Sequence, residues 1–195
     1  MSTLKNICVF CASSTQVPQC YLDDASLLGQ LLAAEGIAVT YGGGSVGLMG
    51  ALAEAVLRQQ GTLIGVIPKF MMELEWGNPN ATRLIVTTDM AERKRKMIEH
   101  ADAIVVLPGG TGTLEELAEV LSMKKLGLFR HPVVLVNTEG FFDLFVQWIK
   151  RMIKDNFLHP AHLEMVSVVN SPSEVIDAIK NALPWTDDHL KYAAL

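Results

Sequence analysis

Two glycine-rich stretches are the parts of this sequence best suited to chemistry. Residues 41–50 read YGGGSVGLMG, and residues 107–116 read LPGGTGTLEE. Each follows a short apolar run typical of a strand and opens an apolar periodicity typical of a helix. At such a turn the first N–H groups of the helix have no partner within the helix and attract an anion such as phosphate. Two turns of this kind favour a site for a phosphorylated ligand over a purely structural role.

The glycine spacing alone does not select the ligand. Gly42, Gly44 and Gly47 satisfy G-x-G-x-x-G, but a dinucleotide site also needs an acidic residue at the end of the next strand. The next predicted strand, residues 63–67, ends in Pro-Lys, so the sequence disfavours NAD. The second turn is not a P-loop, because no Lys follows its last glycine. One alternative stays open for the first turn, that its glycines only permit tight strand-to-helix packing.

Two charged side chains are candidates for acting on such a ligand. Glu116 ends the second turn, where Thr113-x-x-Glu116 also fits a capping box with a purely structural role. Arg93 and Lys94 begin a run of four basic residues, a pattern typical of a solvated helix face. Helical geometry, however, points successive residues about 100° apart, so one or two of them can turn toward a ligand. A guanidinium suits that role because its planar fork bonds two oxyanion oxygens.

The segments that carry these motifs alternate between strand-like and helix-like patterns. This order predicts an α/β fold, a Rossmann-like, doubly wound, mostly parallel sheet with helices on both faces. Residues 1–195 are expected to form one nucleotide-binding domain, in which 184–195 are either a flexible tail or part of an interface. Ligands of such sheets lie beyond the carboxyl ends of the strands, where both glycine turns fall. The predicted strands are residues 7–10, 37–41, 63–67, 84–87, 103–107, 133–136 and 165–169, and the predicted helices are residues 18–35, 46–60, 89–100, 113–126, 141–155 and 171–181.

Composition narrows the class of protein. Half of the residues are hydrophobic and 19% are charged, as in ordinary folded domains. The net charge of −5 does not favour a nucleic-acid partner. No apolar stretch reaches the ~18 residues of a membrane span, and no signal peptide is evident, so we expect a cytoplasmic protein without a membrane partner. The three cysteines are expected to be reduced, and Cys8-x-x-Cys11 has no second pair at zinc spacing, so no metal is expected.

Together these motifs resemble the signatures of the LOG ("lonely guy") family. Its members are cytokinin riboside 5′-monophosphate phosphoribohydrolases and are often labelled lysine decarboxylases. The resemblance covers most of the chain, from Cys8 to Asn170. It is carried by residues 42–50, by Met90-x-x-Arg93-Lys94 and by Pro108-Gly109-Gly110-x-Gly112-Thr113-x-x-Glu116.

The resemblance implies a homodimeric enzyme that needs no cofactor. It would release a free base and ribose 5-phosphate from AMP or from N6-prenylated AMP. By motif position, the catalytic pair falls on Arg93 and Glu116. The substrate contacts implied by the motifs are Glu75, Lys94, Gly109, Gly110, Thr111, Gly112, Thr113, Leu114, Glu115 and Ser122, to which the first turn adds Gly43, Gly44 and Ser45.

The mechanism expected from this resemblance is hydrolysis through an oxocarbenium-like ribosyl transition state. Glu116 would hold the ribose hydroxyls, stabilise the developing cation or orient the water, and Arg93 would position Glu116 and the substrate. Main-chain N–H groups of residues 110–113 would hold the 5′-phosphate. The sequence departs from the family at Ala12, at Ala91 and at residues 123–125, which leaves the base preference open.

Three other functions compete with this prediction. A nucleotide- or phospholigand-binding protein without catalysis would use the same glycine turns. An oxidoreductase is disfavoured by the missing ribose-binding acid. A pyridoxal phosphate decarboxylase would need a Schiff-base lysine, and no lysine in the sequence stands out for that role.

Overall fold

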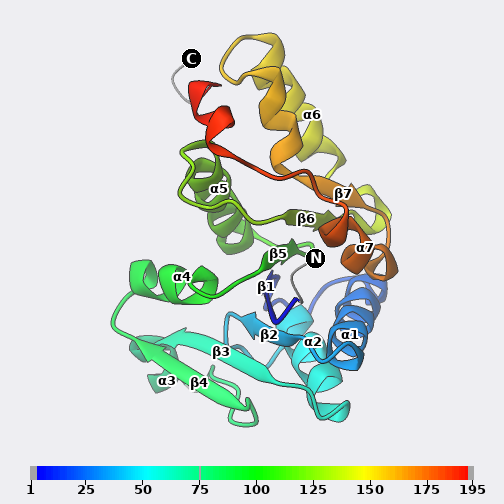
Figure 1. Ribbon diagram of the computed structural model, residues 1–195. Coiled ribbons are helices and arrows are strands. Elements are labelled where there is room, and N and C mark those ends of the chain that lie inside the picture. The colour runs from blue at the N-terminus through cyan, green and yellow to red at the C-terminus, as the bar shows by residue number, and fades with distance from the viewer. Residues whose placement is uncertain (1–3, 75, 193–195) are drawn as a thin grey trace.

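The computed structural model describes residues 4–74 and 76–192. They contain one seven-stranded sheet with the strand order β4-β3-β2-β1-β5-β6-β7, and all neighbouring strands are parallel (Figure 1). The predicted α/β class is confirmed. The strands are β1 (Asn6–Phe10), β2 (Ala38–Tyr41), β3 (Leu63–Pro68), β4 (Arg83–Thr87), β5 (Ala103–Val106), β6 (Val133–Val136) and β7 (Ser167–Val169).

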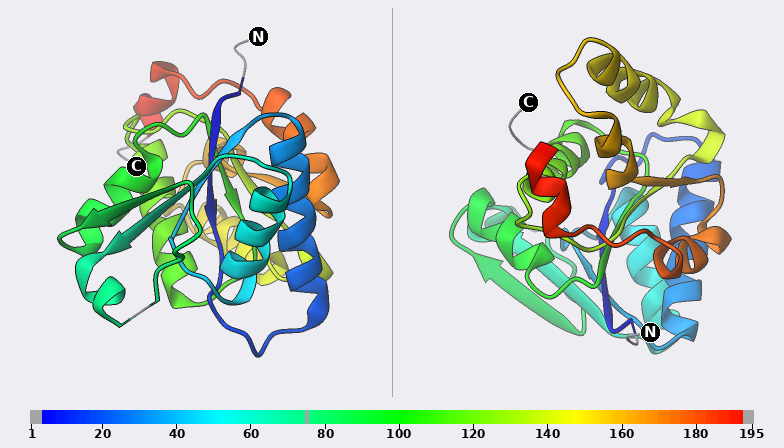
Figure 2. Two further views of the ribbon diagram at one scale, coloured as in Figure 1. Left: turned by 90° about the horizontal axis from the view of Figure 1, so that it is seen from below. Right: turned by 45° about the horizontal axis from the view of Figure 1, so that its top comes forward.

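Helices cover both faces of this sheet. On one face α1 and α2 lie side by side with α7 beyond them, and on the other lie α4 and α5 (Figure 2). The α-helices are α1 (Gln19–Ala34), α2 (Gly47–Arg58), α3 (Lys69–Glu73), α4 (Met90–Ile98), α5 (Thr111–Lys125), α6 (Asp143–Lys154) and α7 (Val175–Lys180), and the 3-10 segments are η1 (Thr138–Gly140), η2 (Pro160–Met165), η3 (Pro172–Glu174) and η4 (Asp187–Tyr192).

The central strand β1 shows why the strand runs read as continuously apolar. Ile7 and Val9 pack into the layer under α1 and α2, whereas Cys8 and Phe10 pack into the layer under α4 and α5. A strand covered on both faces needs apolar residues at every position. β1 is also the point where the strand order reverses, because β2 pairs with one side of it and β5 with the other.

The predicted elements are present in the predicted order, with local differences. Predicted strand 165–169 is shortened to β7, because Pro160 opens the 3-10 segment η2, capped by His159 and His162. Predicted helix 171–181 divides into η3 and α7, although Ser171 caps its start as expected. The short α3 was not predicted, because it has no buried residue and hence no apolar periodicity.

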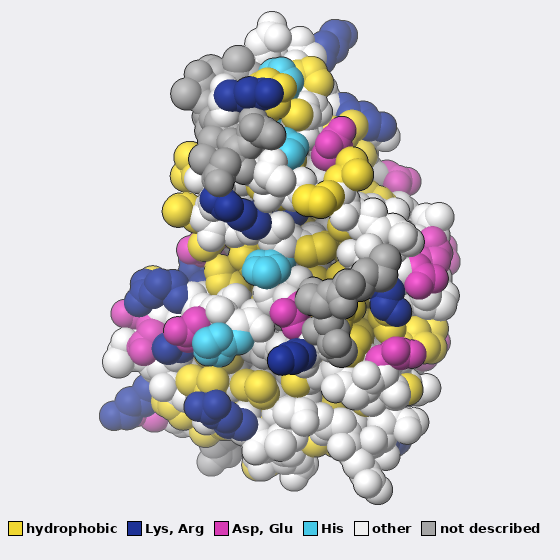
Figure 3. Space-filling view, in the orientation of Figure 1, with side chains coloured by type: hydrophobic (Ala, Val, Ile, Leu, Met, Phe, Trp, Pro, Cys, Tyr) yellow, Lys and Arg dark blue, Asp and Glu magenta, His cyan; other side chains and the backbone are white. Residues whose placement is uncertain are grey.

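The face of the molecule seen in Figure 3 has charges of both signs. On the face seen in Figure 3, Lys and Arg side chains are interspersed with Asp and Glu. In the described parts of the chain, no helix has both the length and the apolarity to cross a bilayer.

Candidate functional site

A cavity of about 540 Å³ lies beyond the carboxyl ends of β1, β2 and β5. Its wall is built from the loops that follow these three strands, together with the starts of α4 and α5 and the segment around α3. This is the point of strand-order reversal at which doubly wound sheets bind ligands. The volume lies within the range of pockets that hold small molecules.

The first glycine turn contributes both wall and clearance. Gly44 and Ser45 line the cavity. Gly43 is not among the lining residues, and its carbonyl accepts a hydrogen bond from the N–H of Asn78. At Gly42 any Cβ atom would collide with a guanidinium nitrogen of Arg93. Gly42 also lines the cavity, and its missing side chain leaves room for the Arg93 guanidinium, so this glycine serves the site as well as the packing.

The second turn brings a helix start to the cavity. Gly110 is the extended N-cap of α5, with φ −89° and ψ −154°, and no side chain caps the helix there. Gly110, Thr111, Gly112 and Thr113 all line the cavity, whereas Gly109 packs behind them against the side chain of Thr113. Uncapped N–H groups at a helix start attract anions, so the predicted anion site at this turn stays a prediction that the geometry permits.

The capping-box interpretation of Glu116 is wrong. Because α5 begins at Thr111, Thr113 lies inside its first turn and is not the N-cap. Glu116 instead pairs with Arg93, whose Nη1 lies 2.9 Å from Glu116 Oε1. Each of these side chains is only 6% exposed. The glutamate therefore belongs to the cavity and not to the helix cap.

Arg93 is held by three elements. Its Nε donates to the carbonyl of Val66 at 3.1 Å, and its Nη2 donates to the carbonyl of Gly42 at 3.3 Å. The N-cap Asp89, predicted from sequence, starts α4 by accepting from the N–H of Glu92 and so sets the position of Arg93. Within the described chain only Oε1 of Glu116 receives a hydrogen bond, which leaves Oε2 for a ligand in the cavity.

The charge on Glu116 is a balance between burial and Arg93. Burial raises the pKa of the carboxyl above its ordinary value, and the Arg93 guanidinium lowers it by a smaller amount. The net direction is upward. The site therefore holds a carboxylate that is more basic than an exposed glutamate and is fixed beside the uncapped start of α5.

Several predicted substrate contacts lie outside this cavity. Lys94 contacts Glu115 and Glu119, and these carboxylates raise the pKa of Lys94. Leu114 is 47% exposed, and the hydroxyl of Ser122 donates to the carbonyl of Ala118 in the same helix. A substrate contact by Lys94, Leu114, Glu115 or Ser122 stays a prediction. The predicted contact Glu75 lies outside the described residues.

Part of the cavity lining is apolar, and sequence reasoning did not assign it to the site. It is formed by Met49, Ile67, Met71, Trp76 and Met90. Apolar side chains on four separate segments carry no local signal of a shared pocket.

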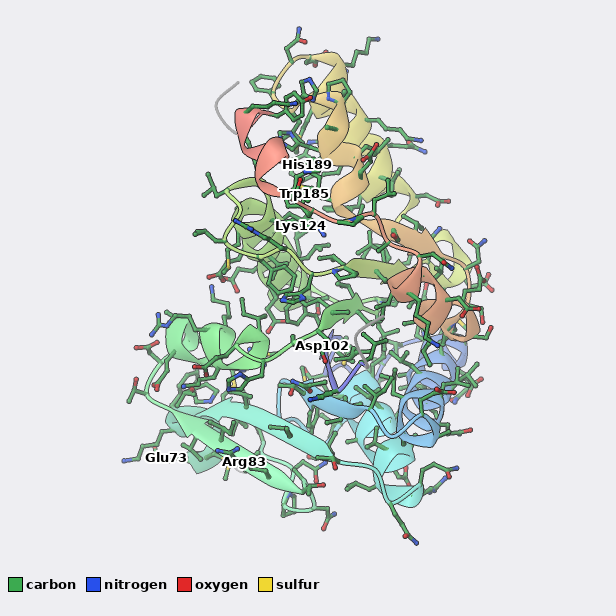
Figure 4. The ribbon with its side chains drawn as sticks, viewed as in Figure 1. Glu73, Arg83, Asp102, Lys124, Trp185 and His189 are labelled. Carbon is green, nitrogen blue, oxygen red and sulfur yellow. The ribbon has the colours of Figure 1, made fainter. Side chains whose placement is uncertain are left out.

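Residues 123–125, a departure from the family pattern, do not line the cavity. Lys124 is 3% exposed and donates to the carbonyl of His131 at 2.7 Å. Trp185 covers it and donates from its Nε1 to the carbonyl of Lys124 at 2.6 Å (Figure 4). Burial lowers the pKa of Lys124 to about 8. Lys124, which lies at this departure, therefore packs against Trp185, away from the cavity.

Comparison with known proteins identifies the family. A family model described as "Possible lysine decarboxylase" matches residues 49–179. The cytokinin riboside 5′-monophosphate phosphoribohydrolase LOG1 of Arabidopsis thaliana is 38% identical over 183 residues, which cover 94% of this chain and 86% of that protein. The chain belongs to the LOG family. A second relative is LOGL9 of Oryza sativa subsp. japonica, which is named a probable cytokinin riboside 5′-monophosphate phosphoribohydrolase. It is 41% identical over 89% of this chain and 77% of its own length.

Solved structures show how widely this fold is used. The molybdenum cofactor binding protein of Rippkaea orientalis has 27% identity and a TM-score of 0.69, over 91% of this chain and 96% of that one. The molybdenum cofactor carrier protein of Chlamydomonas reinhardtii, with 23% identity and a TM-score of 0.71 over 92% and 98% of the two chains, shares the fold alone. The same scaffold therefore occurs in proteins that are named for cofactor binding or carriage. In this chain the side chains at the cavity must decide the activity.

Proposed function

We propose that this chain hydrolyses the N-glycosidic bond of adenine-type nucleoside 5′-monophosphates, AMP or N6-prenyl-AMP, to a free base and ribose 5-phosphate. The observation that carries the proposal is the buried Arg93–Glu116 pair beside the uncapped start of α5 in one cavity. The names of the LOG relatives support the same reaction.

In this reaction the bond between C1′ and the base nitrogen breaks, and a water oxygen forms a new bond to C1′. One water proton goes to the departing base, directly or through a basic group, and the other stays on the oxygen as the new 1-hydroxyl of ribose 5-phosphate. Positive charge develops on the ribosyl ring before water adds. The carboxylate of Glu116 stabilises that charge and orients the ribose or the water, and Arg93 holds the carboxylate in place. N–H groups of residues 111–113 hold the phosphate and so fix the sugar against Glu116.

The 5′-phosphate is expected to be essential for turnover. Adenosine lacks the group that the start of α5 binds, so kcat/KM for adenosine should be lower than for AMP by about 10³-fold. Adenine release from the two substrates, followed chromatographically, measures this ratio. Equal rates would contradict a phosphate site at residues 111–113. AMP that binds but remains intact would favour a carrier without catalysis.

The activity is expected to fall at acid pH because of Glu116. Its raised pKa means that the carboxylate becomes protonated at a pH above 4.5, the ordinary value for glutamate. The acid limb of kcat at saturating AMP should therefore have its midpoint above pH 4.5. The contribution of Glu116 to the free energy of unfolding has the opposite sense, since it is largest below 4.5 and is lost as the pH rises through the raised pKa. A kcat that stays constant down to pH 4.5 would contradict this assignment.

The assembly and location of the protein are further parts of the proposal. A homodimer is supported by large apolar side chains exposed at the end of α5, where Leu126 is 54% and Leu128 is 69% exposed. A reducing compartment such as the cytoplasm is supported by the free, buried thiols of Cys8 and Cys11.

A further inference from the structure

Trp76 occupies a distinctive place in the cavity. Among the described residues that line it, Trp76 is the only aromatic side chain. It lines the cavity together with three methionines, and it is 55% exposed. A large aromatic ring that remains half exposed beside an apolar cavity is available to a ligand in a way that a core tryptophan is not.

The backbone around Trp76 is tied to the site on both sides. The N–H of Trp76 donates to the carbonyl of Met71 at 3.2 Å. The next residue, Gly77, forms an antiparallel bridge with Gly44, and the N–H of Asn78 donates to the carbonyl of Gly43 at 2.8 Å. The segment that carries the ring is therefore anchored to the first glycine turn, which itself forms part of the cavity wall.

The polar and apolar residues of the cavity lining indicate where each part of a nucleotide would lie. With the phosphate at residues 111–113 and the ribose at Glu116, the base has to extend toward the remaining lining, in which Trp76 and three methionines offer more apolar surface than the serines offer polar surface. Every nucleobase has a π-face, and stacking on an aromatic side chain is a common way for proteins to bind it. Methionines adapt to the edges of such a ring but do not stack on its face.

We propose that Trp76 stacks on the purine base of the bound nucleotide and determines its affinity and orientation. The proposal rests on the function given above, because that function sets the direction in which the base extends. A two-ring purine presents more stacking surface than a pyrimidine. Trp76 therefore also favours AMP over CMP.

The test compares two ligands that differ only in the base. Ribose 5-phosphate carries the phosphate and the sugar but no base, so its binding reports on every contact except those with the base. In Trp76→Ala the Kd for AMP, measured by calorimetry in a Glu116→Gln background that slows turnover, should rise about ten- to a hundred-fold. The Kd for ribose 5-phosphate should not change, and Trp76→Phe should recover most of the affinity for AMP.

Trp148 provides a matched control, because it is 56% exposed on α6 and does not line the cavity. Trp148→Ala should leave both Kd values unchanged. AMP should quench the tryptophan fluorescence of the protein. This quenching should disappear in Trp76→Phe and should persist in Trp148→Phe. An equal loss of affinity for both ligands in Trp76→Ala, or no loss for either, would overturn the stacking role. A Trp76→Ala protein that binds AMP normally but changes its oligomeric state would also overturn it and would assign the ring to a contact between copies.

The outcome for stacking is separable from the outcome for catalysis. If AMP binds to Trp76 but no adenine is released by the wild-type protein, the hydrolase function fails and the stacking role stands. If adenine is released by Trp76→Ala with an unchanged KM, the stacking role fails and the function stands. Absence of AMP binding to the wild-type protein would overturn both.

Discussion

Replacing Glu116 by Gln is expected to lower kcat for adenine release by about 10³-fold while the protein stays folded. The amide keeps the shape of the side chain and an oxygen that can accept from Arg93. Arg93 also keeps its two backbone acceptors, the carbonyls of Val66 and Gly42. The substitution removes the negative charge that opposes the developing cation on the ribose. The loss should therefore appear in kcat, with a smaller effect on the affinity for ribose 5-phosphate.

A second glutamate distinguishes this effect from a general loss of charge. Glu99, at the end of α4, is exposed, pairs with Lys96 and does not line the cavity. Glu99→Gln should keep normal turnover, and both variants should unfold at temperatures close to that of the wild-type protein. Near-normal turnover by Glu116→Gln would remove Glu116 from the chemistry.

Replacing Arg93 by Met is expected to lower the free energy of unfolding by about 3–5 kcal/mol and to abolish most of the activity. The change leaves Glu116 buried without its cation, and it removes the donor from the carbonyls of Val66 and Gly42. The pKa of Glu116, already raised by burial, should rise further because the opposing effect of Arg93 is gone. Denaturant unfolding and adenine release measure the two effects separately.

A double variant separates the structural and the catalytic parts of this loss. Arg93→Met with Glu116→Gln removes the uncompensated charge, so it should be more stable than Arg93→Met alone but equally inactive. Arg95→Met, an exposed neighbour on the same helix, should change neither property. Wild-type stability of Arg93→Met would contradict the view that this pair holds the site together, and recovered activity in the double variant would contradict its catalytic role.

Much of the fold could be predicted from local pattern. Strands covered on both faces read as apolar runs, and Asp89 and Ser171 mark the starts of the helical segments that follow them. Prediction failed where local pattern is weak. The helix α3 has no buried face, and the start of the predicted strand 165–169 is lost because Met165 belongs to η2, which His159 and His162 cap at its own start.

The site divides in the same way. The two glycine turns were found from sequence because a strand followed by glycines and a helix has one local geometry, whichever fold contains it. The apolar part of the cavity lining was not found from sequence. Its residues come together only after α2, α4 and the segment around α3 have packed, and they include Met49, Met71, Trp76 and Met90.

The sequence by itself determined the α/β class, the two glycine-rich strand-to-helix turns, and Arg93 and Glu116 as candidates. These depend on periodicity, turn chemistry and side-chain type, which are properties of neighbouring residues. Only the tertiary structure decided between the open alternatives for these residues. It placed the start of α5 at Thr111, so that Glu116 pairs with Arg93 rather than caps its own helix. The physical reason is that a buried charge needs an opposite charge close to it. For Glu116 that charge is Arg93, which lies on another helix and comes close only when the chain has packed.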